Sequence, residues 1–121
     1  MTTIESVASD EEMNTAIALF MGAKIDKHGR IYGLSNKGHY RAESLTYDSS
    51  WDSLMEVFER IKSSGKYSYE LGVMKNTEYN FVVIAEVKHI HKKQLVYFPS
   101  REPLITIAHR AVYKFITEHN K

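Results

Sequence analysis

The sequence predicts an α+β fold, a three-layer α/β/α sandwich whose mostly antiparallel sheet carries helices on both faces. The first observation is the run of five apolar residues at positions 81–85, which puts apolar side chains on both faces of one strand. The second is a set of three stretches with helical spacing of apolar residues, which predict the helices that cover the two faces of the sheet. The predicted order is α-β-β-(β)-α-β-β-β-α, in one domain over residues 9–121 after a frayed segment 1–8.

Composition limits the class of protein. The 121 residues include 43% hydrophobic residues, enough for one domain with a real core. The formal net charge is only +1, so a nucleic acid or an anionic membrane would have to use a local patch. There is no cysteine, which excludes disulfides and thiolate chemistry and fits a reducing cytoplasm. No apolar stretch is long enough to predict a membrane span.

The first helix is predicted to begin near Asp10. Ser9 and Glu12 have the spacing of a capping box, and acidic residues suit the positive end of a helix. Gly22 can take the left-handed conformation that ends it. One apolar stripe follows the helical spacing, formed by Met13, Ala16, Ile17, Phe20 and Met21.

Short strands are expected next, over residues 24–26 and 30–34. Gly29 permits the positive φ of a tight hairpin between them. A weaker pattern over residues 39–44 extends the predicted sheet by a further strand.

The second helix has the clearest signals. Ser49 or Ser50 can cap it, Asp52 lies in its first turn, and Gly65 ends it. Its apolar face is predicted to contain Trp51, Leu54, Met55, Phe58 and Ile61.

Three strands and a last helix complete the chain. Alternating apolar residues from Tyr67 to Val73 predict a strand that pairs with the central run, and residues 94–98 predict another that ends at Pro99. The last helix is expected from Glu102 or Pro103 to His119, because proline is tolerated in a first helical turn.

Three segments resemble a family of small phage- and prophage-encoded proteins, the phage ABA sandwich domain. They are Phe-Met-Gly at residues 20–22, residues 47–61 with a Ser-Trp-Asp helix start, and residues 111–116 of the last helix. The chain differs from that pattern at Ser53 and Glu56. The resemblance implies a sandwich fold and a phage-associated protein of a bacterial host, with no established activity, cofactor or catalytic residue.

A basic segment is the candidate nucleic-acid site. Lysines could neutralise phosphates, and the first hairpin could add to them if both hairpins open at the same sheet end. The candidate residues are Lys88, His89, His91, Lys92, Lys93, Lys27 and Arg30. A solvated hairpin tip is the alternative. A metal site at His89 and His91 with Glu86 is disfavoured, because further ligands are missing and the lysines repel a cation.

Aromatic residues form the candidate protein-binding set. Trp51, the single tryptophan, is expected in the core unless its edge stays exposed together with Met55, in which case it could anchor a partner. Tyr67 and Tyr69 are the other candidates, since an exposed tyrosine cluster is typical of binding surfaces.

The sequence contains no recognisable catalytic motif and calls for no cofactor or metal. The leading hypothesis is a noncatalytic, phage- or prophage-associated accessory protein in the cytoplasm of a bacterial host, which binds another macromolecule, most readily a protein. The alternative is nucleic-acid binding through residues 88–93, and a small metal-dependent enzyme is a third possibility. No membrane partner is expected. A homodimer could form through an edge strand at residues 94–98 or 39–44.

Overall fold

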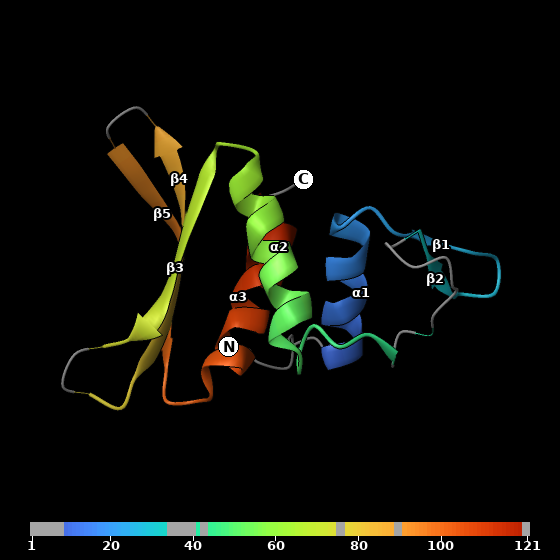
Figure 1. Cartoon of the computed structure of the whole chain (residues 1–121), viewed down its shortest axis with the longest axis horizontal. Helices are drawn as coiled ribbons and strands as arrows, with labels where there is room; N and C mark the ends of the chain where they lie inside the picture. Colours follow the sequence, from blue (N-terminus) through green and yellow to red (C-terminus); the bar gives the residue numbers. More distant parts are fainter. Residues whose placement is uncertain (1–8, 34–40, 42–43, 75–76, 89–90, 120–121) are drawn as a thin grey trace, which may run out of the picture.

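The computed structural model describes residues 9–33, 41, 44–74, 77–88 and 91–119 (Figure 1). Within this part of the chain there are three helices and five strands. In chain order they are α1 (Asp10–Phe20), β1 (Lys24–Ile25), β2 (Ile31–Tyr32), α2 (Trp51–Ser63), β3 (Tyr67–Val73), β4 (Asn80–Lys88), β5 (His91–Ser100) and α3 (Leu104–His119). The predicted fraying of residues 1–8 lies outside the described residues.

Both predicted caps form. The Ser9 amide donates to Glu12 Oε1 at 3.1 Å and the Glu12 amide donates to Ser9 Oγ at 3.2 Å, which completes the capping box of α1. Gly22 then turns the chain with φ of 101°. At the start of α2, Ser50 rather than Ser49 is the cap, and its hydroxyl accepts from the Ser53 amide at 3.3 Å. Local polar groups therefore set where these two helices begin.

The strands form two separate antiparallel sheets in the described residues, where the sequence analysis predicted one. β1 and β2 pair only with each other, and the second sheet has the order β3-β4-β5. β4 is the central strand, as predicted for the apolar run. β5 is longer than predicted and continues through Pro99, which an edge strand tolerates because its outer side needs no ladder bond. Of the strand predicted over residues 39–44, the described residues Arg41 and Ser44 are not in a strand.

The helices lie on one side of the three-stranded sheet (Figure 1). α3 packs against β4 and β5, α2 packs against β3, and α1 packs on α3 as a further layer with the β1–β2 hairpin beyond it. The α+β class, the antiparallel pairing and the three helices are confirmed. The prediction that helices cover both faces is wrong, because α1 seats its apolar stripe on α3 and not on the sheet.

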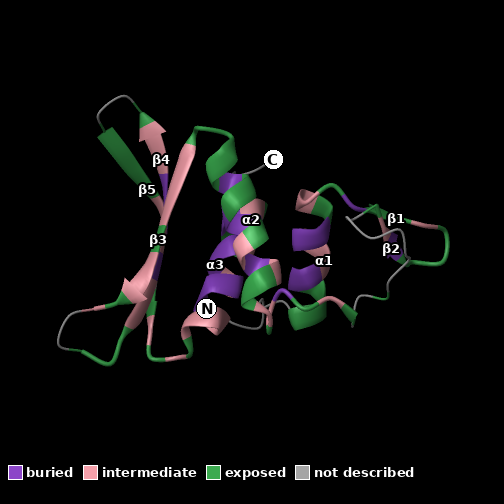
Figure 2. Cartoon of the chain, viewed as in Figure 1, coloured by how far each residue is buried: buried purple, intermediate pink, exposed green. Residues whose placement is uncertain are grey.

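The core lies between the sheet and the helices, where Figure 2 shows the buried residues gathering. Val82 and Ile84 of β4 are fully buried against the helices, whereas Phe81 and Val83, on the other face, are half-buried. The helices supply the rest of the buried cluster, with Ile17 and Ala18 from α1, Leu54, Val57, Phe58 and Ile61 from α2, and Ile107, Ala108, Ala111, Val112 and Phe115 from α3. No helix in the described part of the chain combines the length and apolar character that crossing a membrane requires.

Candidate functional site

A shallow groove runs along the outer side of α2. It has a volume of about 690 Å³ and is lined by Met21, Asp52, Met55, Glu56, Glu59, Arg60 and Ser63. Two methionines supply apolar surface, and three carboxylates outnumber the single arginine. Because methionine is flexible and polarizable, it suits a surface that adapts to a partner. The groove therefore offers an apolar floor with an acidic rim.

Trp51 lies one helical turn before Met55 on α2 and is 38% exposed. The sequence analysis placed it in the core unless its edge stayed exposed together with Met55. That second arrangement is the one found, since Met55 is half-buried and lines the groove. Val57, which was not predicted on the apolar face of this helix, is fully buried in the core.

Tyr67 and Tyr69 turn toward the helices. The Tyr67 ring meets Phe115 edge-on with centroids 4.9 Å apart, and the Tyr69 ring lies 4.8 Å from Phe58. The Tyr69 hydroxyl donates to Glu59 at 2.6 Å, and this hydrogen bond, more than burial, raises the pKa of Tyr69. Tyr69 thus fixes one carboxylate of the groove wall. A direct role of the two tyrosines in partner binding stays a prediction.

The candidate basic residues divide between two distant ends of the molecule (Figure 1). Lys27 and Arg30 lie in the turn between β1 and β2, and Lys88, His91, Lys92 and Lys93 lie at the far end of the other sheet. Lys88 pairs with Glu86 at 3.5 Å. The sequence analysis predicted a joint basic patch if both hairpins opened at the same sheet end. That condition is not met, because the hairpins belong to different sheets. His89 lies outside the described residues.

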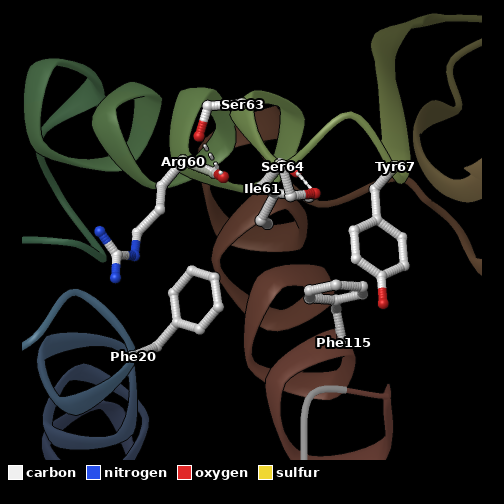
Figure 3. Close-up of a pocket in the computed structure, with 7 residues that line it drawn as sticks. All are labelled: Phe20, Arg60, Ile61, Ser63, Ser64, Tyr67 and Phe115. Atoms are coloured by element: carbon white, nitrogen blue, oxygen red, sulfur yellow. Dashed lines mark hydrogen bonds between the residues drawn. The ribbon is translucent and has the colours of Figure 1, made fainter.

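A second hollow, which the sequence did not predict, opens beside the groove at the ends of the helices (Figure 3). Its volume is about 370 Å³, and it is lined by Phe20, Arg60, Ile61, Ser63, Ser64, Tyr67 and Phe115. The Arg60 guanidinium lies over the Phe20 ring at 5.7 Å from its centroid. Phe20 in turn meets Phe115 edge-on, with centroids 6.5 Å apart. Arg60 and Ser63 line both the groove and this aromatic hollow.

A polar network crosses the helix layer between α1 and α3. The buried Asn14 side chain donates to Asp48 Oδ1 at 2.9 Å and to the Leu45 carbonyl at 3.3 Å. Its own oxygen faces His109 Nε2 at 2.8 Å. Because the Asn14 nitrogen already donates, the oxygen must accept, so His109 carries its proton on Nε2. Burial lowers the pKa of His109, with Asp48 and Asp10 opposing the shift and Arg110 adding to it.

Acidification should weaken the fold through His109. Above the ordinary histidine pKa, about 6.5, the folded and unfolded chains both hold a neutral imidazole. Below it the unfolded chain takes up a proton that the buried side chain resists, so stability falls as pH falls. Urea unfolding at pH 8 and pH 5.5 measures the effect. The His109→Gln variant keeps an amide at this position and should lose less stability between the two pH values, and an equal loss in both proteins would contradict the assignment.

The fold and these surfaces define a small α+β protein with an apolar, acid-rimmed groove on one helix. Among the described residues no three His, Asp or Glu side chains gather as metal ligands. Comparison with protein-family models, with curated proteins and with solved structures found no match to this chain. The resemblance to phage ABA sandwich domains accordingly stays a prediction.

Proposed function

We propose that this chain is a noncatalytic accessory protein that binds another protein through the groove on α2. The observation that carries the proposal is the exposed Trp51 on α2, one helical turn before Met55, which lines a hollow with an apolar floor. Tryptophan is a frequent anchor of protein interfaces. Covering an exposed indole removes apolar surface from water, and the free energy gained in this way favours partner binding. The association with a phage or prophage, and with the cytoplasm of its bacterial host, rests on the family resemblance alone.

The charges of the groove specify the chemistry of the partner. Asp52 and Glu56 present exposed carboxylates, and Glu59 is held in place by Tyr69. A basic segment with one apolar face would place its side chains over Met21 and Met55 and its cations against the acidic rim. Amphipathic helices bind grooves in this way, and the charge pattern sets their orientation and their rate of encounter.

Fluorescence of the single tryptophan can test the groove directly. The probe is a synthetic peptide of about 14 residues, roughly four helical turns, with leucines on one face and lysines elsewhere. We expect it to shift the Trp51 emission to shorter wavelength, because binding removes water from the indole. A peptide with glutamates in place of the lysines is expected to produce no shift.

Two variants give the matched comparison. Met55→Lys should weaken binding about tenfold or more, since it removes floor area and adds a repelling charge. Ile25→Lys changes another exposed apolar residue, 49% exposed on β1, and should leave binding unchanged. The groove would be ruled out as the binding site if the lysine and glutamate peptides bound equally well. It would also be ruled out if Met55→Lys bound the lysine peptide as well as the unmodified protein does. A protein captured from a bacterial lysate qualifies as the partner only if Met55→Lys fails to retain it.

Nucleic-acid binding is the second candidate, favoured by the exposed cluster of Lys88, His91, Lys92 and Lys93 on one hairpin. Such a site would be local, since Lys27 and Arg30 lie too far away to join it. The expected result is a complex in a mobility-shift assay at low salt that weakens when Lys92 and Lys93 are replaced by alanine. No retardation of DNA or RNA at micromolar protein would exclude this candidate.

A further inference from the structure

The sheet face turned away from the helices is apolar along its central strand. Strand alternation puts Phe81, Val83, Ala85 and Val87 of β4 on this face. Its two sides come from the edge strands, and Tyr97 of β5 is 45% exposed there. In the described part of the chain no helix lies over this face (Figure 2). Phe81, Val83 and Val87 are therefore left half-exposed on this face, whereas Ala85 is buried.

The register arranges this face in rows across the three strands. Gly72, Phe81 and Pro99 form one row of Cα partners, and Glu70, Val83 and Tyr97 form the next. A third row contains Ser68, Ala85 and Gln94, after a register shift of the β4–β5 pair between Ile84 and Ala85. Each of the last two rows has an apolar residue in the middle and a polar group at either side.

Gly72 lets the Phe81 ring lie close to the sheet in the first row. A Cβ at this position would lie 3.1 and 3.2 Å from ring atoms of Phe81, so the ring rests over the glycine backbone. With Pro99 on the opposite strand, the Phe81 ring is the one large side chain of this row. Lys92, in the row of Val87, closes the other end with a charge. The surface between them suits another sheet better than an inserted helix.

We infer that this face packs against the same face of a second copy of the chain. A two-fold axis parallel to β4 would place β4 over β4, and β3 of each copy over β5 of the other. The apolar middle residues of each row would then meet their own counterparts.

The flanking groups are complementary under the same axis. Glu70 of one copy would face Tyr97 of the other, where its carboxylate can accept from the phenol, and Ser68 would face Gln94. The face matches itself row by row, which a contact with an unrelated sheet would not require.

The size of the face predicts a weak dimer. Three strands at about 4.8 Å spacing and the seven residues of β3 at about 3.3 Å each give a footprint of roughly 14 by 23 Å. That is well below the roughly 800 Å² per partner of a stable interface, so association is expected at micromolar concentration. The α2 groove lies away from this face, and a dimer would therefore present two grooves to a partner.

Sedimentation velocity of the full chain from about 1 to 200 μM tests the inference. Twice the mass of one chain should appear as concentration rises, and Val83→Lys should remain a monomer. Val73→Lys, at a site 62% exposed on β3 but outside the face, should still dimerise. A monomer throughout, or a dimer that Val83→Lys leaves intact, overturns the inference. The second outcome would fit pairing through an edge strand such as β5.

A charge exchange tests the two-fold arrangement. Tyr97→Glu sets a second carboxylate against Glu70 of the other copy and should prevent dimerisation, and adding Glu70→Lys should restore it. Within one chain these residues are separated by β4, so rescue reports the contact between copies. Failure of the rescue overturns the arrangement. Peptide binding by Val83→Lys separates the two proposals, because a monomer with an intact groove still shifts the Trp51 emission.

Discussion

Replacing Phe115 with alanine should lower the free energy of unfolding by about 3 to 5 kcal/mol. Phe115 is only 1% exposed, and its ring makes edge contacts with both Tyr67 and Phe20. It thus joins α3, β3 and the end of α1. Its removal takes away the burial of a large ring and leaves a cavity that elements from three parts of the chain would have to fill together. Urea unfolding followed by circular dichroism measures the loss.

The neighbouring Lys114→Ala provides the control, because Lys114 is exposed on the same helix. Its effect should stay within about 0.5 kcal/mol, as is usual for surface positions. A loss below about 1 kcal/mol for Phe115→Ala would mean that this helix face does not form the core.

Features encoded by nearby residues could be predicted from the sequence. The capping box of Ser9 and Glu12 spans four positions, and the cap and apolar face of α2 lie within one segment. The central place of β4 followed from its apolar run. In each case the groups that stabilise the element are close along the chain, so their spacing indicates their geometry.

The layer order could not be predicted in the same way. The apolar residues at positions 81–85 indicate a strand with two apolar faces, and this is what β4 has. They do not indicate what covers each face. Val82 and Ile84 meet helices, whereas Phe81 and Val83 lie on the side that none of the described helices covers. A strand face that packs against a second copy of the chain needs the same apolar residues as a face that packs against a helix of its own chain.

The candidate sites show the same limit. Lys27 and Lys92 both lie on basic hairpins, but membership of different sheets puts them at opposite ends of the molecule. Trp51 follows the helical spacing of a core residue, yet it is the first residue of α2 and is 38% exposed. Position in the assembled fold, and not spacing along the chain, decides whether the two hairpins meet and whether Trp51 is buried.

The contact between Asn14 and His109 joins residues 95 positions apart, and no spacing rule could have predicted it. Asn14→Leu, nearly equal in volume, should destabilise the protein by about 2 to 5 kcal/mol. It leaves the Asp48 carboxylate, the Leu45 carbonyl and the His109 N–H without the partner that they share. Orphaned polar groups cost about 1 to 3 kcal/mol each when buried, and more when charged. Asp48 and Leu45 are only half-buried, so water can recover part of that loss.

A double-mutant cycle distinguishes this network from simple packing. His109→Phe removes the other end of the hydrogen bond and, combined with Asn14→Leu, replaces a polar pair by an apolar pair of similar shape. If the pair is coupled, the double variant should be more stable than the sum of the two single losses predicts, by about 0.5 to 3 kcal/mol. Additive losses would mean that the two residues act independently. Asn14 belongs to α1 and His109 to α3. The coupling energy would therefore measure how much this hydrogen bond contributes to holding α1 in one position on α3, beyond the packing of its apolar stripe.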